Sequence, residues 1–158
     1  LCILPVLFVC ENIQYGMSMA SEKAVAGESI ASRGNSYGIE SVQIDGNDVE
    51  AVYESVSSCK DEILSNKRPT FIEAVTYRYR GHSKSDRNLY RTSEEINFWK
   101  DEKDPIKRYI GKLLEQGITE VDLKEIDEEV KQTIRTSVKK ALDSPLSPIT
   151  NLEEDSYA

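Results

Sequence analysis

A concentration of positive charge surrounds the only histidine of this chain, His82. Residues 77–91 carry five basic side chains and a single acid, so their net charge is +4, while the whole chain carries −8. The basic residues are Arg78, Arg80, Lys84, Arg87 and Arg91. So much positive charge in an acidic protein indicates a site for an anionic ligand or partner. The alternative is a solvated loop whose cations pair with nearby acids, and charge alone does not decide between the two.

His82 adds a group that can hold or release a proton near neutral pH. Gly81 precedes it, and Ser83 and Ser85 follow it. Such a histidine could serve in proton transfer, but an isolated histidine is more often a surface or capping residue. The loop residues by themselves favour a surface or capping histidine.

The stretch that has to position this loop is residues 70–77, directly before it. Its side chains are mostly β-branched, aromatic or small, and Pro69 introduces the run, which is typical of a buried strand. Ligands of open α/β sheets sit beyond the carboxyl ends of the strands. The basic stretch of residues 77–91, here called the cationic loop, begins at that end. The sequence therefore places it where a ligand is expected.

Two further strands are expected. Residues 5–10 form a short, continuously apolar run of the kind that parallel sheets bury on both faces. Residues 41–44 form the second strand, and Asp45 and Gly46 make the turn that follows it. Residues 11–19, ENIQYGMSM, follow the carboxyl end of the first strand and occupy a second place where a ligand is expected.

The helices between these strands also have sequence signals. Residues 21–37 are expected to form a short helix that ends at Gly38. Asn47 is expected to cap the next helix, with Glu50 completing a box-like arrangement. Apolar residues recur at helical spacing from 49 to 63, so this helix packs one face on a sheet. The order strand, helix, strand, helix, strand predicts an α/β fold with a parallel sheet and right-handed crossovers.

Two shorter helices are predicted after the cationic loop. Residues 92–95 form a capping box for a helix at residues 96–100. Asp104 and Pro105 give the next helix an N-cap and a proline at its first position, and Gly117 closes it.

A long helix is expected from Thr119 to about Leu142. Its apolar stripe consists of Ile126, Val130, Ile134, Val138 and Ala141. Its interleaved charges are typical of a solvated face. From Asp143 onward, prolines and acids predict a tail that could dock along a partner subunit and does not fold alone.

Composition limits the class of protein. The 158 residues are one domain's worth of chain, and 39% hydrophobic with 30% charged residues is a soluble, globular composition. No apolar run reaches the length of a membrane span, and the net acidity argues against a nucleic-acid partner. Cys2, Cys10 and Cys59 are odd in number and lack CxxC spacing, so they are expected to be reduced, mostly buried thiols of a cytoplasmic protein.

Four stretches of the chain together resemble one known family. They are ENIQYGMSM at residues 11–19, IDGNDVEAV at 44–52, YRYRGHSKSD at 77–86 and YRT at 90–92. In order and spacing they resemble the alpha subunit of the thiamine-diphosphate-dependent 2-oxo acid dehydrogenases, the first component of the pyruvate, branched-chain and acetoin dehydrogenase complexes. The resemblance extends over nearly the whole chain, from Leu4 to the tail. It implies part of a thiamine-diphosphate-binding fold, with a short parallel sheet flanked by helices and a helical carboxy-terminal region.

The resemblance also divides the chain. Residues 1–91 would be the carboxy-terminal part of the thiamine-diphosphate-binding α/β domain, residues 92–142 a helical extension, and residues 143–158 an acidic tail. In the family, a preceding half carries a Gly-Asp-Gly element that holds the diphosphate through a metal. No such element precedes residue 10 here, so the chain is expected to be the carboxy-terminal portion of a longer subunit.

Site residues of the family can be carried over one by one. The resemblance implies decarboxylation of a 2-oxo acid, or cleavage of acetoin, with acyl transfer to a lipoyl group, and the cofactors thiamine diphosphate and magnesium. His82 matches the catalytic histidine of the loop that closes over the cofactor, and Arg80 would help to hold the anionic cofactor. Asn12 matches a cofactor-binding position, and Tyr15 matches the residue that holds magnesium through its backbone carbonyl. Ile13 stands where the family has a second, metal-binding asparagine, and an isoleucine side chain has no donor atom.

The implied partners are a beta subunit and the lipoyl-bearing acyltransferase component. A truncated sheet would expose an edge and an apolar face, so a homo-oligomer is also expected. A second interpretation is a catalytically inactive subunit-interaction fragment without the metal-diphosphate clamp, which Ile13 favours. A third, a general phosphate-anion binder, lacks a glycine-rich cradle. Without the resemblance, Asn12 and Gly16 would be read as an ordinary turn.

Overall fold

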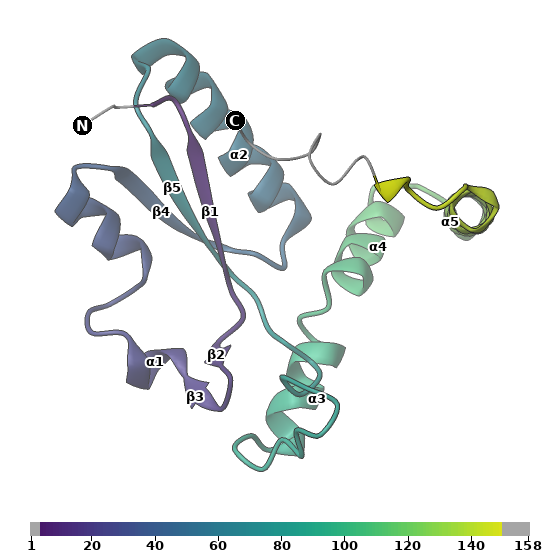
Figure 1. Ribbon diagram of the computed structural model, residues 1–158, viewed down its shortest axis with the longest axis horizontal. Coiled ribbons are helices and arrows are strands. Elements are labelled where there is room, and N and C mark those ends of the chain that lie inside the picture. The colour runs from purple at the N-terminus through teal and green to yellow at the C-terminus, as the bar shows by residue number, and fades with distance from the viewer. Residues whose placement is uncertain (1–3, 150–158) are drawn as a thin grey trace. The chain divides into compact units, whose positions relative to one another are not determined.

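The computed structural model describes residues 4–149, which form two compact units that divide after Lys112. The first unit contains a three-stranded parallel sheet flanked by helices, and the second contains one long helix (Figure 1). The α/β class and the parallel sheet predicted from the sequence are therefore confirmed. The predicted subdivision of the chain at residues 91 and 142 remains a prediction.

The sheet has the strand order β1-β5-β4, and both pairs of neighbours run parallel (Figure 1). Its strands are β1 (Leu7–Asn12), β4 (Glu40–Asp45) and β5 (Thr70–Val75). The central strand is the most buried, and Ile72 and Glu73 on it are less than 2% exposed. Asn12, Asp45 and Val75 stand in register. The three strands therefore end level, and the segments that follow β1 and β5 leave the sheet at one edge.

The first strand is less buried than its apolar run predicts. Phe8 and Val9 are 48% and 54% exposed, and side chains of successive residues point to opposite faces of a sheet. The prediction of a strand buried on both faces was wrong. The physical reason is that parallel sheets bury both faces only where other elements cover them, and within residues 4–149 α2 is the main helix that packs on β1.

Residues 21–37 form two short helical pieces where one helix was expected. The elements of this region are the hairpin strands β2 (Tyr15–Gly16) and β3 (Met19–Ala20), α1 (Ser21–Ala24) and the 3₁₀ helix η1 (Ala31–Tyr37). Gly27 between the two helical pieces has a φ of 106°, which an α-helix cannot contain. Gly38 has a φ of 65° and ends η1, so the predicted glycine stop is confirmed.

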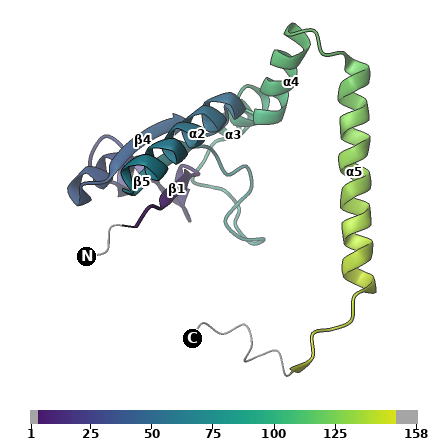
Figure 2. The ribbon, with the colours of Figure 1, turned by 90° about the horizontal axis from the view of Figure 1, so that it is seen from above.

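The long helix of the first unit, α2 (Val49–Asn66), lies along the sheet (Figure 2). Cys59 and Ile63 on its inner face are buried, as the helical spacing predicted. Its N-cap is Asp48, whose Oδ1 accepts hydrogen bonds from the backbone N–H groups of Glu50 and Ala51 at 3.1 and 3.2 Å. These bonds satisfy amide groups that the first helical turn leaves unpaired.

Asn47, the residue expected to cap α2, has a different task. It is buried, its Nδ2 donates to the carbonyl of Lys103 at 2.8 Å, and its Oδ1 accepts from the hydroxyl of Thr76 at 2.6 Å. The cap prediction was wrong by one residue because two partners distant in sequence occupy the amide. The carboxylate of Asp48 caps α2 instead.

The helices after the cationic loop begin where their caps predicted. They are α3 (Ser93–Asp101) and α4 (Pro105–Glu115). Thr92 Oγ1 accepts from the N–H of Glu95 at 3.1 Å. Asp104 Oδ1 accepts from the N–H groups of Ile106 and Lys107, both at 3.0 Å.

Ion pairs hold the first turns of α4 against the start of α2. Arg108 pairs with Asp45 at 2.9 Å and with Asp48 at 3.3 Å. Lys112 pairs with Glu50 at 2.8 Å. These contacts join a strand end, a helix N-terminus and α4 within the first unit.

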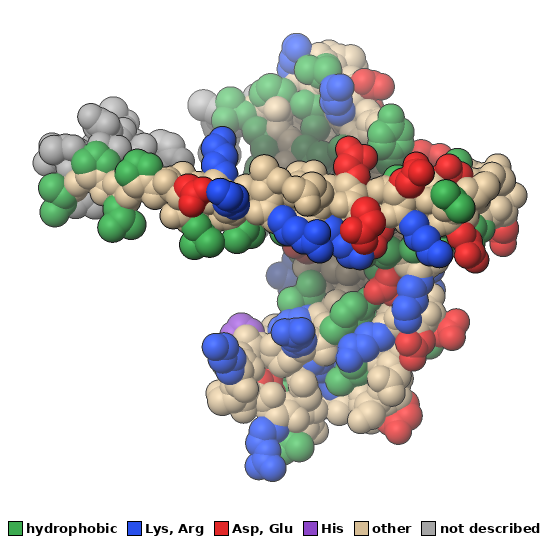
Figure 3. Space-filling model, turned by 90° about the vertical axis from the view of Figure 1, so that its right-hand side faces the viewer, with side chains coloured by type: hydrophobic (Ala, Val, Ile, Leu, Met, Phe, Trp, Pro, Cys, Tyr) green, Lys and Arg blue, Asp and Glu red, His purple; other side chains and the backbone are tan. Residues whose placement is uncertain are grey.

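The second unit is dominated by α5 (Glu120–Asp143), whose charged and apolar side chains are visible on the surface in Figure 3. Thr119 and Asp122 form the reciprocal capping box that starts it, as the sequence predicted. Residues 150–158 of the predicted tail lie outside the described residues. Within residues 4–149, no helix combines the length and the apolar character that crossing a membrane requires.

Candidate functional site

Arg91 holds the backbone of the cationic loop in place. Its side chain donates to the carbonyls of Arg78 and Arg80 and to Asn88 Oδ1, the last two bonds being 3.0 and 2.6 Å long. The residue is only 8% exposed, and its guanidinium carbon lies 5.3–5.4 Å from the centroids of three tyrosine rings. The rings belong to Tyr15, Tyr77 and Tyr90. The charge of Arg91 therefore stabilises the loop itself and does not face an external anion.

Asp86 is the acid at the centre of the same loop. Its Oδ2 accepts from the backbone N–H of His82 and from the hydroxyl of Tyr90, both at 2.8 Å, and its Oδ1 accepts from the N–H of Asn88 at 2.9 Å. These bonds, that from Asn88 first, lower the pKa of Asp86 to about 2. Gly81 is needed beside it, because a Cβ there would lie 2.8 Å from the Asp86 Cβ.

Arg78 ties the cationic loop to the segment after β1. Its Nη1 donates to the carbonyl of Tyr15 at 3.1 Å, and its Nη2 donates to the carbonyl of Met17 at 2.7 Å. Nη2 also donates to the hydroxyl of Tyr90 at 3.0 Å. Through this one side chain, the segments that leave β1 and β5 are brought together.

Glu95 on α3 anchors the tyrosines beneath the loop. Its Oε1 accepts from the hydroxyls of Tyr77 at 2.7 Å and Tyr15 at 2.9 Å, and Trp99 stacks on Tyr77 with ring centroids 5.0 Å apart. Burial, with the hydrogen bond to Glu95 next in importance, raises the pKa of Tyr77 to about 12. The same causes raise the pKa of Tyr15. Because the Glu95 carboxylate binds these hydroxyls, only the Thr92 half of the predicted capping box forms.

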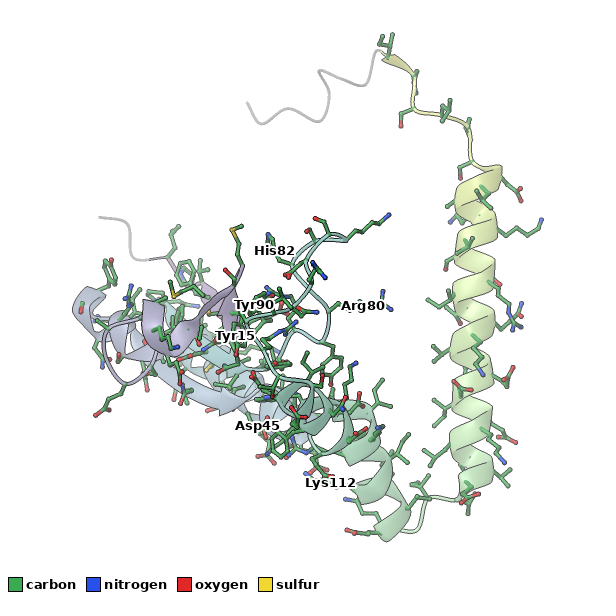
Figure 4. All side chains as sticks on the ribbon, turned by 90° about the horizontal axis from the view of Figure 1, so that it is seen from below. Tyr15, Asp45, Arg80, His82, Tyr90 and Lys112 are labelled. Carbon is green, nitrogen blue, oxygen red and sulfur yellow. The ribbon has the colours of Figure 1, made fainter. Side chains whose placement is uncertain are left out.

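His82 and Arg80 are the predicted site residues that the loop leaves free. Both are exposed, and neither side chain makes a hydrogen bond within residues 4–149. A shallow hollow of about 400 Å³ lies beside the loop; its lining includes Met17, His82, Ser83, Asp86 and Tyr90. Figure 4 shows Arg80 extending away from Tyr15 and Tyr90. The structure therefore brings His82 to the hollow and leaves Arg80 outside it.

Asn12, the predicted cofactor-binding residue at the end of β1, has its side chain occupied inside the fold. Its Nδ2 donates to Glu73 Oε1 at 2.7 Å, and its Oδ1 accepts from the N–H of Gln14 at 3.1 Å. Glu73 is fully buried on β5, and its Oε2 accepts from the N–H of Ala31 at 2.8 Å. One carboxylate thus holds the segment after β1 and the start of η1.

The donor atoms of residues 12–15 do not fit a magnesium ion, which requires several oxygen ligands. The carbonyl of Tyr15 accepts from the guanidinium of Arg78, and a second cation there would be repelled. Ile13 offers no side-chain donor, and Asn12 faces inward. The described part of the chain also has no group of three or more His, Cys, Asp or Glu side chains placed to hold a metal. Tyr15 as a metal ligand therefore remains a prediction that this donor set does not favour.

Glu73, Asp86 and Arg91, which hold these segments in place, were not among the predicted site residues. Glu73 had a signal, since an acid within an otherwise apolar strand is rarely buried without partners. Asp86 and Arg91 had no such signal, because the sequence shows them only as charged residues of the loop. Their roles depend on carbonyls, amides and tyrosine rings that the fold brings together.

The whole of this framework lies within a stretch that matches a known family model. Residues 1–150 match the model described as dehydrogenase E1 component. The chain is 37% identical over 153 residues to the pyruvate dehydrogenase E1 component subunit alpha of Rhizobium meliloti (strain 1021), covering 96% of this chain and 44% of that protein. It is 39% identical to the type I mitochondrial counterpart of Ascaris suum, covering 98% of this chain and 39% of that protein.

A relative whose name indicates a different substrate matches as well. The mitochondrial 2-oxoisovalerate dehydrogenase subunit alpha of Mus musculus is 40% identical over 114 residues, which are 72% of this chain and 26% of that protein. The chain thus spans less than half the length of each of these curated relatives.

Proposed function

Because the chain belongs to the dehydrogenase E1 component family, we propose that it acts as part of the alpha subunit of a 2-oxo acid dehydrogenase. Pyruvate is the first substrate to test, since the names of the relatives from Rhizobium meliloti and Ascaris suum include it. The observation that carries the proposal is the framework of Arg91 and Asp86, which orders the loop while leaving His82 free beside a hollow.

In this proposal, the chain supplies a positioned histidine and positive charge. Thiamine diphosphate, when bound in such an enzyme, supplies the carbanion chemistry. The His82 imidazole holds or releases a proton at the hollow, because neither of its ring nitrogens is used within the described fold. Arg80 attracts anionic groups toward the loop from outside the hollow. Residues 12–15 do not fit magnesium, so this proposal gives them no part in metal binding.

The overall reaction defines the partners that we propose. A 2-oxo acid loses carbon dioxide, and its acyl group passes to a lipoyl disulfide, which is reduced as the acyl carbon is oxidised. A beta subunit and a lipoyl-bearing acyltransferase component would complete this sequence. A cytoplasmic location is proposed from the free thiols of Cys10 and Cys59, although two of the relatives are named mitochondrial.

A second candidate is a subunit-interaction fragment without activity of its own. The specific observation in its favour is the Arg78 guanidinium on the Tyr15 carbonyl, together with Ile13 at the position of a metal-binding asparagine. In this function the chain keeps the loop and its partner surfaces but does not contribute a metal clamp.

Activity of the subunit containing this chain, assembled with its beta subunit, tests the first proposal. Pyruvate decarboxylation is followed with His82→Ala, which should lower kcat by about 100-fold or more if the histidine transfers a proton. Lys84→Ala is the matched control, because Lys84 is exposed on the same loop and does not line the hollow. Equal losses in both variants would mean that only the loop charge matters, and the proton role would be rejected.

Calorimetric titration of thiamine diphosphate with magnesium separates the two candidates. Binding by the original chain supports the enzyme function and contradicts our reading of residues 12–15. Absence of binding by both the original chain and Ile13→Asn supports the interaction fragment. Binding by Ile13→Asn alone would assign the defect to that single side chain.

A further inference from the structure

The apolar stripe of α5 has no function in the proposed site. Ile126, Val130, Ile134 and Val138 recur every four residues and are 53–59% exposed. With 3.6 residues per turn, this spacing keeps the four side chains on one face of the helix. Stripes of exposed β-branched residues on an otherwise charged helix are typical of a helix–helix interface.

The charges of α5 are separated along its length. Residues 120–130 contain six acids and one base, a net charge of −5, whereas residues 131–143 contain four bases and one acid, a net charge of +3. In Figure 3, acidic and basic side chains gather over different stretches of this helix. The helix macrodipole accounts only for charges in the first and last turns. Asp127, Glu129 and Arg135 lie in the middle of the helix and need another explanation.

From this polarity we propose that α5 pairs with the α5 of a second copy of this chain in antiparallel orientation. In that orientation the acidic half of each helix lies along the basic half of the other, whereas parallel helices would place like charges together. The stripe is compatible with the same symmetry, because Ile and Val alternate along it. In an antiparallel pair, each Ile of one helix therefore lies opposite a Val of the other.

The side chains suited to this pairing flank the stripe. Asp127 lies beside the stripe in the acidic half, and Arg135 lies on the same side of it in the basic half, as follows from the helical period. Arg135 forms no ion pair within residues 4–149. Asp127 pairs with Lys131 one turn along the helix, and exposed pairs of this kind contribute little, so they do not prevent exchange for a partner across the interface.

Charge reversal in the 158-residue chain tests the proposal by sedimentation equilibrium. One variant carries Asp127→Lys, and the other carries Arg135→Glu. Each alone should raise the dissociation constant of the dimer about tenfold or more, because the facing charges then become alike. Mixing the two variants, or combining both substitutions in one chain, should restore association. Raising the salt concentration should weaken the original dimer.

A matched control separates pairing from net charge. Glu128→Lys changes the net charge as much as Asp127→Lys in the same half of the helix, but Glu128 lies on the face opposite the stripe. This control should associate within about threefold of the original chain. Circular dichroism of each variant verifies that the helix is retained.

Three outcomes would overturn the proposal. A chain that is monomeric at every concentration would show that the stripe serves a different partner, such as a beta subunit. Association that survives both reversals would place the interface elsewhere, for example on the exposed face of β1. Association that strengthens with salt would indicate parallel pairing.

Discussion

The segments that leave the carboxyl ends of β1 and β5 use their polar groups in opposite ways. After β5, Arg91 and Asp86 bind the backbone of the loop, and His82 is left exposed beside a hollow. After β1, the side chain of Asn12 and the carbonyl of Tyr15 are both occupied by neighbours. Two segments at the same edge of one sheet therefore differ in what they can offer a ligand, because different side chains satisfy their polar groups.

The comparison also explains why the positive charge of residues 77–91 does not by itself identify an anion-binding site. Of the five cations in residues 77–91, Arg78 and Arg91 bind carbonyls of the fold. Only the exposed remainder faces solvent, so the loop presents less free charge than its composition implies. Substitutions that remove the contacts of each segment in turn measure how independent the two segments are.

Replacing Arg91 should have the largest effect. Arg91→Met removes the hydrogen bonds to the carbonyls of Arg78 and Arg80 and to Asn88 Oδ1, and it removes the cation from three tyrosine rings. We expect the free energy of unfolding to fall by about 3–4 kcal/mol. Urea denaturation measures it, with Arg87→Met as the control, since Arg87 is exposed on the same loop. A loss similar to that of the control would contradict the framework role.

The second largest effect is expected for a substitution that disturbs the segment after β1. Glu73→Gln keeps the shape of the side chain but turns an amide N–H toward either the Asn12 amide or the Ala31 N–H, so one donor loses its acceptor. We expect a loss of about 2 kcal/mol and faster hydrogen exchange at Gln14, while exchange at His82 stays unchanged. Glu11→Gln, an exposed change on β1, is the control. Equal acceleration at both segments would show that they are coupled.

A smaller effect is expected at the tyrosines that the two segments share. Tyr77→Phe removes the hydroxyl that donates to Glu95 and should cost about 1 kcal/mol at neutral pH. Since the folded pKa of Tyr77 is about 12 and unfolded tyrosine titrates near ~10, its contribution is present below pH ~10 and is lost as the pH rises toward 12. Phenolate absorbance and denaturation across this range measure it. Tyr37→Phe, at an exposed residue, should leave the alkaline transition unchanged.

The smallest expected effect is a change in the acid pH dependence of the cationic loop. The folded pKa of Asp86 is about 2, below the unfolded value of ~3.9, so its contribution is present above pH ~4 and is lost as the pH falls toward 2. Hydrogen exchange at the amides of His82 and Asn88 should accelerate over that interval, and Asp86→Asn should remove the dependence. Asp61→Asn, on the exposed side of α2, should retain it. A dependence that survives in Asp86→Asn would assign it to another acid.

Local signals in the sequence determined where most elements begin and end. Thr92, Asp104 and Thr119 cap their helices, and Gly38 adopts the left-handed conformation that ends η1. The parallel sheet followed from the alternation of strands and helices. These features depend on residues within a few positions of one another, so the sequence alone contains the interactions that produce them.

Only the tertiary structure decided which polar groups remain free. Asn12 meets Glu73 across 61 positions, and Arg78 meets the carbonyl of Tyr15 across 63. Asn47 loses its capping role to partners 29 and 56 positions away, and the apolar β1 is half exposed because the described elements do not cover both of its faces. A buried polar group must find a partner wherever the fold provides one, and residue type does not reveal which partner that is.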